Sequence, residues 1–193
     1  EPRSDLDLTA VLRDVLSVVL RSVSAESGSI LVLDEGGWPS QWFILENGKG
    51  EFATLARARA VMDRGMIGWT IRNRQGDLVN DLTQDPRWLD LPDFPHNIAQ
   101  GSALLLPLMV YDRVTGVLTL IHPEPGFFKP RHLSLLQTVI ERVALSIENA
   151  RLYATVHRRA EEMAALYEVS LNISADQPLF RLLDTIVAQA MDL

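Results

Sequence analysis

The stretch SALLLPLMVYDRVTGVLTLIHP, residues 102–123, decides the fold. Its two halves are apolar runs of strand length, and a turn expected from Asp112 to Gly116 separates them. Apolar runs divided by turn residues are typical of neighbouring antiparallel strands. Pro107 should lie at an edge or a bulge, because proline has no backbone N–H to donate to a ladder. The stretch therefore predicts a β-hairpin.

The residues before this hairpin predict a helix followed by two further strands. Residues 5–23 carry apolar side chains at helical spacing, and an aspartate near the start of this run can cap the helix. Two β-rich runs follow, SGSILVLDEGG (27–37) and WPSQWFILENGKG (38–50). Because only an acidic and glycine-rich turn divides them, we expect two neighbouring antiparallel strands.

Two short helices and a loop complete the region between these strands and the hairpin. Residues 51–65 read as a helix that ends at Gly65, and residues 66–76 as a second helix that ends at Gly76. DLVND (77–81) is a brief strand. Residues 82–100, rich in proline and aspartate, form a long loop.

The last third of the chain reads as one long helix. Proline and glycine are both absent between Pro130 and Pro178, and the apolar positions follow steps of three and four. A helix over residues 131–174 would be about 66 Å long, so its far half must project from the domain. Its apolar stripe then needs a partner, most simply the same helix of a second chain. Folding back of residues 155–174 is the alternative.

Three segments follow from this organisation. Residues 1–153 form the domain, residues 154–176 a linker or coiled-coil-like helix, and residues 177–193 the start of a second domain of the same kind. The last assignment rests on an echo between residues 177–193 and the first helix, where apolar positions coincide.

The composition of the chain argues against several classes of function. The formal net charge of −7 argues against a nucleic-acid partner, which requires a clustered basic face. No apolar run reaches the length of about 20 residues that a membrane-spanning helix needs. Cysteine is absent, so no disulfide, thiolate nucleophile or cysteine-held zinc can form. These features fit a cytoplasmic protein.

Three strings resemble the GAF domain family: GMIGWTIRNRQGDLVNDLTQDPRW (65–88), SALLLPLMVYDRVTGVLTL (102–120) and PGFFKPRHLSLLQTVIERVALSIENARLY (125–153). Residues 158–174 resemble the linker helix that leads to a second GAF domain in bacterial sensor kinases. The resemblance implies an α+β, PAS-related fold with a central antiparallel sheet of five or six strands and helices on one face. It also implies a ligand pocket on the other face and a regulatory role.

Departures from the subfamilies restrict the ligand. Members that carry a covalent bilin and members that reduce methionine sulfoxide need cysteine, which this chain lacks. The signature of cyclic-nucleotide-binding members is also missing. We therefore expect no covalent cofactor, although non-covalent haem remains compatible with the residues.

Asp81 and Asp85 are four residues apart and could be an acid/base pair. Asp85 precedes Pro86 and should cap a short helix at residues 87–89, and Asp81 can accept turn N–H groups. Arg87 can pair with either carboxylate. The sequence shows no nucleophile beside them, so a structural role is favoured over a hydrolase that uses Asp81, Asp85 and His96.

Aromatic residues of the same region are candidates for a pocket, since pockets are mostly apolar with few polar groups. His96 could bond to a ligand or ligate haem iron. The expected candidate pocket residues are Trp69, Asp81, Trp88, Phe94, His96 and Ser102.

These inferences together predict a sensory and dimerisation module of a bacterial signal-transduction protein, such as a sensor histidine kinase. It would not be an enzyme, would bind an unknown small molecule, and would dimerise through the C-terminal helix. A ligandless domain that only dimerises or binds another protein is the alternative.

Overall fold

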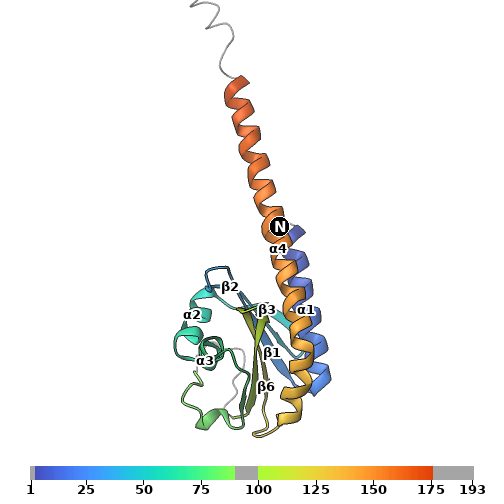
Figure 1. Cartoon of the computed structure of the whole chain (residues 1–193), viewed down its shortest axis with the longest axis vertical. Coiled ribbons are helices and arrows are strands. Elements are labelled where there is room, and N and C mark those ends of the chain that lie inside the picture. The colour runs from blue at the N-terminus through green and yellow to red at the C-terminus, as the bar shows by residue number, and fades with distance from the viewer. Residues whose placement is uncertain (1–2, 90–99, 176–193) are drawn as a thin grey trace, which may run out of the picture.

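The computed structural model describes residues 3–89 and 100–175 of the chain (Figure 1). The elements, in chain order, are α1 (Arg3–Val23), β1 (Ser27–Leu33), β2 (Pro39–Glu46), β3 (Lys49–Phe52), α2 (Leu55–Arg64), α3 (Met66–Asn73), β4 (Asp77–Val79), the 3-10 helix η1 (Leu82–Gln84), β5 (Ser102–Val110), β6 (Arg113–His122) and α4 (Pro130–Ala175).

A six-stranded sheet forms the centre of the fold. Its strand order is β3-β2-β1-β6-β5-β4, and every neighbouring pair is antiparallel. Strands β1 and β6 occupy the middle and pair from Ser27 opposite Ile121 to Val32 opposite Gly116. The expected α+β fold with a central antiparallel sheet is confirmed.

Helices cover both faces of the sheet. α1 and α4 lie antiparallel on one face, whereas α2 and α3 lie on the other (Figure 1). Side chains of a strand alternate between the two faces, and this alternation produces two cores. Ile30, Leu118 and Leu120 pack under α1 and α4, whereas Leu31, Val117 and Ile121 pack under α2 and α3. The long helix therefore lies on the face opposite to the two short ones.

The β5–β6 hairpin is present, but its turn comes earlier than expected. The turn is at Tyr111 and Asp112, and Tyr111 adopts a left-handed φ of 51°. Gly116 lies inside β6 between Val32 and Leu108. A Cβ there would come within 2.4 Å of the Leu31 carbonyl oxygen. Gly116 is thus required by the close packing of β6 against β1 and not by the turn. The expected turn from Asp112 to Gly116 was too long because this glycine was assigned to it.

Pro107 lies where its missing N–H does no harm. β4 pairs only with residues 103–105 of β5, so no strand of the described residues lies beside Pro107 on that side. The pairing of β5 with β6 shifts register just after this proline, between Leu108 and Met109. The expected edge position is confirmed.

Two local predictions were wrong. Residues 51–52 belong to β3, not to a helix: Asn47 (φ 48°) and Gly48 (φ 76°) form a two-residue turn that returns the chain along β2. α3 ends at Arg74, which adopts the left-handed conformation and donates its N–H to Thr70, rather than at Gly76. The expected glycine stop was unnecessary because arginine tolerates this single position.

α4 is one helix of 46 residues, so the alternative in which residues 155–174 fold back is wrong. Its first half packs on α1 and β5, and its second half projects beyond the sheet (Figure 1). No helix of the described residues combines the length and hydrophobicity needed to cross a membrane. Residues 177–193, and with them the predicted second domain, lie outside the described residues.

Candidate ligand-binding site

A cavity of about 40 Å³ lies between the sheet and the helices α2 and α3. Most of its walls are apolar and buried. Its polar groups come from the two central strands and from the segment after η1. The residues that line it are Gly28, Ser29, Trp42, Val61, Gly65, Met66, Ile67, Arg87, Trp88, Leu89, Leu105, Thr119 and Ile121.

Two hydroxyl side chains form the polar part of the sheet surface inside the cavity. Ser29 of β1 is directly opposite Thr119 of β6, and both are at most 6% exposed. Side chains of directly opposite residues in an antiparallel pair are neighbours. The Thr119 hydroxyl is buried and has no hydrogen-bond partner among the described residues. A buried hydroxyl of this kind costs free energy unless something enters the cavity and bonds to it.

Close packing of α2 against α3 forms the wall opposite the sheet. Thr54 caps α2 by accepting the Arg57 N–H. Gly65 and Gly68 then let the chain turn back, since a Cβ on Gly68 would lie 1.7 Å from the Met62 carbonyl oxygen. Close packing of the two helices therefore explains both glycines.

Arg87 borders the cavity and is held by two carboxylates. Its Nη1 lies 2.8 Å from Asp77, while its Nε and Nη2 donate to Asp85 at 2.9 and 2.6 Å. The guanidinium also stacks 4.9 Å from the centre of the Trp69 ring. The hydrogen bond from Arg87 holds the pKa of Asp85 below its ordinary range, and Asp85 raises the pKa of Arg87. Asp85 and Arg87 are therefore both charged at neutral pH.

The two aspartates of the sequence motif have structural roles. Asp81 caps η1, accepting hydrogen bonds from the Thr83 N–H and hydroxyl. Asp85 accepts the Arg87 N–H as well as its side chain. The helix expected at residues 87–89 is absent: the chain forms a turn in which Trp88 donates to the Asp85 carbonyl. Arg87 pairs with Asp77 and Asp85, and not with Asp81, because β4 brings Asp77 beside it.

The expected candidate residues differ in their relation to the cavity. Trp88 lines it, whereas Trp69 is not part of the lining and packs its ring against the Arg87 guanidinium. Asp81 is occupied by its own turn. Phe94 and His96, and with them the haem-ligand idea, lie outside the described residues.

Ser102 is on the wrong face. It shares the alternation of Leu104 and Leu106, which pack under α1 and α4, and its hydroxyl donates to the Glu124 carbonyl at 2.8 Å. A shift of one residue along a strand moves a side chain to the other side of the sheet.

Sequence reasoning missed Ser29, Trp42, Arg87 and Thr119 as cavity residues. Alternation would have placed Ser29 with Leu31, and Thr119 with Val117, on one face. Identifying that face required knowing which helices cover it. Among the described residues, no group of three or more histidines or acidic residues could hold a metal ion.

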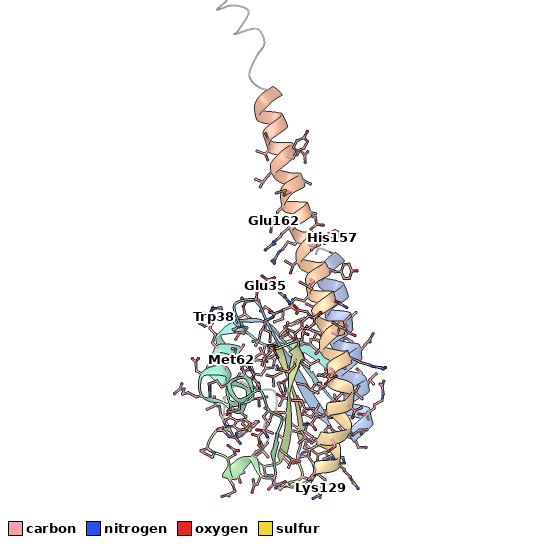
Figure 2. All side chains as sticks on the ribbon, in the orientation of Figure 1. Glu35, Trp38, Met62, Lys129, His157 and Glu162 are labelled. Carbon is pink, nitrogen blue, oxygen red and sulfur yellow. The ribbon has the colours of Figure 1, made fainter. Side chains whose placement is uncertain are left out.

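A second polar cluster fastens α4 to the sheet. Glu148, 5% exposed, lies 2.6 Å from Arg113 Nη2 of β6 and accepts two hydrogen bonds of 2.9 Å from Arg151. Arg151 also approaches Glu35 of the β1–β2 turn at 3.9 Å. Figure 2 shows Glu35 at the end of the domain where α4 leaves it, with His157 and Glu162 further along the helix.

Comparison with known proteins settles the family. A family model described as a GAF domain matches residues 5–148. The chain belongs to the GAF domain family. The matched residues contain every strand that the structure describes, the cavity, and Arg113 and Glu148, while Arg151 and the projecting half of α4 lie beyond them.

Curated relatives of this GAF domain are much longer proteins. The formate hydrogenlyase transcriptional activator FhlA of Escherichia coli (strain K12) is 38% identical over 76 residues, which are 37% of this chain and 11% of that protein. The dual 3',5'-cyclic-AMP and -GMP phosphodiesterase 11A of Takifugu rubripes is 24% identical over 183 residues, or 90% of this chain. The match spans 20% of that phosphodiesterase.

Solved structures agree in fold. The GAF domain from a phosphoenolpyruvate-protein phosphotransferase of Coxiella burnetii superposes with a TM-score of 0.60 at 16% identity, covering 77% of this chain and 86% of that one. The second GAF domain of DevS from Mycobacterium smegmatis gives 0.51 at 23% identity, covering 79% and 99%. Similarity at these identities shows the fold alone.

Proposed function

We propose that this GAF domain is a regulatory sensory module of a bacterial signal-transduction protein, that it binds a small molecule in the cavity, and that α4 transmits its state. The observation that carries the proposal is the buried Thr119 hydroxyl of the mostly apolar cavity, which has no hydrogen-bond partner in the part of the chain that the structure describes. A ligand group that bonds to it would relieve a cost that the empty domain bears.

The central strands connect the cavity with α4. β6 turns Thr119 and Ile121 toward the cavity, and Leu118 and Leu120 toward α1 and α4. A ligand that displaces β6 therefore also displaces the side chains of β6 that pack against α4. Arg113 at the start of β6 adds a direct contact with Glu148 of α4. Transmission requires that the ligand favours one of two arrangements of this contact.

The projecting half of α4 supports dimerisation. It exposes large apolar side chains, which a helix in water does not retain without a partner. The residues are Leu152, Tyr153, Val156, Met163, Leu166, Tyr167 and Val169. The steps Val156, Met163 and Leu152, Leu166 are multiples of seven, the repeat of a coiled coil. A parallel homodimer would bury this stripe, and the paired helices would couple the cavities of the two protomers.

Further details belong to the same proposal. A sensor histidine kinase in the cytoplasm is the kind of protein that we favour, with the domain regulatory and not catalytic. Asp81 and Asp85, the groups that a hydrolase would need, are engaged in turn and ion-pair contacts. A GAF domain without ligand that serves only dimerisation is the second candidate, favoured by the small volume of the cavity.

The test combines binding with a readout on α4. Nucleotides, amino acids, aromatic acids and haem are screened by thermal shift, against the chain and against Ser29→Val, whose added methyl groups fill the cavity. Because the chain has no cysteine, a single Glu168→Cys carries a spin label on α4. We expect a hit that is lost in Ser29→Val and that changes the distance between labels in the dimer. A flat panel would favour the ligandless candidate.

A further inference from the structure

The sheet surface of the cavity offers hydrogen bonds without a charge. Ser29 and Thr119 face each other across β1 and β6, and the Thr119 hydroxyl has no partner among the described residues. A hydroxyl both donates and accepts, so this pair suits a hydroxyl, a carbonyl or an amide group equally well. The walls beside the pair are Trp42, Leu105 and Ile121, which add apolar contact.

Among the described residues that line the cavity, Arg87 alone carries a charge, and that charge is already compensated. Each of its three nitrogens lies within 2.9 Å of an oxygen of Asp77 or Asp85. Its planar face is covered by the Trp69 ring. These contacts engage three of the five N–H donors, so an anionic ligand at the remaining two would share the guanidinium with two carboxylates.

The charges of this cluster add up to −1, from two carboxylates and one guanidinium. The first turn of α3 contributes a positive potential through Met66 and Ile67, but a helix terminus is equivalent to only about half a charge. That potential favours a carbonyl oxygen without neutralising a carboxylate. Hence a ligand with a full negative charge meets net repulsion at the side of the cavity where Arg87 lies.

We propose, on the basis of the ligand-binding function above, that the cavity takes an uncharged small molecule whose terminal hydroxyl, carbonyl or amide group bonds to Ser29 and Thr119. The Asp77–Arg87–Asp85 cluster excludes carboxylates and phosphates of the same shape. Selectivity therefore rests on charge as well as on size.

Size restricts the group that enters. The cavity of about 40 Å³ is much smaller than the cavities of about 150 Å³ that take up benzene. Only a terminal group of a few atoms fits into the space between the sheet and the helices α2 and α3. The remainder of a larger ligand lies against Trp88 and Leu89, the half-buried apolar residues of the lining.

Isosteric pairs that differ only in charge test the proposal. Acetamide is compared with acetate, and benzamide with benzoate, at pH 7 and constant ionic strength. Binding is followed by NMR through the indole N–H signals of Trp42 and Trp88. We expect each amide to bind at least about tenfold more tightly than its carboxylate. Thr119→Val should weaken amide binding about three- to tenfold, whereas Ser102→Ala, on the other face, should leave it unchanged.

A second variant tests the role of the ion cluster. Asp85→Asn keeps an acceptor for the Arg87 N–H but removes one carboxylate, so the ratio of benzoate to benzamide affinity should rise about tenfold. The matched control is Asp81→Asn, which removes the same charge from the same segment without contacting Arg87. An unchanged ratio in Asp85→Asn, or equal rises in both variants, would overturn the proposed exclusion.

The outcomes separate this proposal from the more general one. Tighter binding of the carboxylates overturns the uncharged-ligand proposal and leaves a sensory role standing. If the isosteric probes give no signal, the charge of any compound that binds in the broader screen and is lost in Ser29→Val decides: neutral supports the proposal, anionic overturns it. If nothing binds in either experiment, both proposals fail.

Discussion

Arg113 at the start of β6 lies 2.6 Å from the buried carboxylate of Glu148, on the helix that leaves the domain. Arg151 binds both oxygens of the same carboxylate from one turn further along α4. A buried carboxylate held by two guanidinium groups resists displacement, because any separation leaves a charge in the interior without its partner. The contact makes the position of α4 depend on the strand that also carries Thr119.

The first prediction concerns acid stability. Hydrogen bonds from Arg151, assisted by Arg113, hold the pKa of Glu148 below its ordinary value of 4.5. A lowered pKa means that the stabilisation is complete above pH 4.5 and is lost as the pH falls through the lower value of the folded state. Glu148→Gln should cost about 3 kcal/mol at pH 7 and should unfold with a shallower dependence on pH between about 5 and 3.

Urea denaturation at several pH values measures this effect. Asp85 also has a lowered pKa, so Asp85→Asn is the necessary comparison: it should remove its own part of the acid dependence and retain that of Glu148. Equal acid profiles for Glu148→Gln and the unmodified chain would contradict the assignment.

The second prediction is a stabilising substitution. Thr119→Val keeps the shape of the side chain and removes a buried hydroxyl that has no partner among the described residues. The domain without ligand should gain about 1 kcal/mol in its free energy of unfolding. Thr115→Val is the control, since the Thr115 hydroxyl donates to the Leu108 carbonyl and its removal should be destabilising. Calorimetry that ranks the two variants in the reverse order would show that Thr119 is bonded within the domain.

The third prediction concerns the contact of α2 with α3. Gly68→Ala would place a Cβ 1.7 Å from the Met62 carbonyl, so the two helices must separate. We expect a loss of about 1–3 kcal/mol and an altered environment of Trp42 in the cavity. Gly36→Ala, whose nearest neighbours are side chains of an exposed turn, should change stability by less than about 0.5 kcal/mol. Tryptophan fluorescence during thermal unfolding reports both quantities.

The fourth prediction concerns the dimer. Met163→Glu combined with Leu166→Glu places carboxylates in the apolar stripe of α4, and two copies of the helix should then repel each other. Sedimentation should show a shift from dimer to monomer. Ala165→Glu adds charge beside the stripe and should leave the dimer intact. A chain that is monomeric at every concentration before substitution would remove the proposed interface.

Periodic elements were predictable because their signal is local. The two apolar runs divided by turn residues in 102–123 and the uninterrupted helical spacing after Pro130 each identify their element without reference to the rest of the chain. β3 was missed since Lys49–Phe52 is largely exposed and lacks an apolar pattern. Its signal is the Asn47–Gly48 pair, and Asn-Gly between two strands is strong evidence for a hairpin.

The site was harder to predict because it depends on which face of the sheet each helix covers. Trp88 was an expected candidate and lines the cavity. Choosing Ser29 in place of Ser102 would have required knowing which helices cover each face of the sheet. The pairing of Arg87 with Asp77 is a further example. Asp77 looked like an ordinary residue at the start of a strand, and its role follows from the position of β4 at the sheet edge.

The length of α4 beyond the domain converts a small tilt at its attachment into a large displacement of its far end. From Arg151 to Ala175 the helix extends about 36 Å beyond its attachment at Glu148. A tilt of about 5° at that attachment would move the far end by about 3 Å, which is about half the rise of one helical turn. In the proposed function, the helix is a lever that pivots at the Glu148 ion cluster, and a ligand of only a few atoms displaces the far end enough for an adjoining domain to detect.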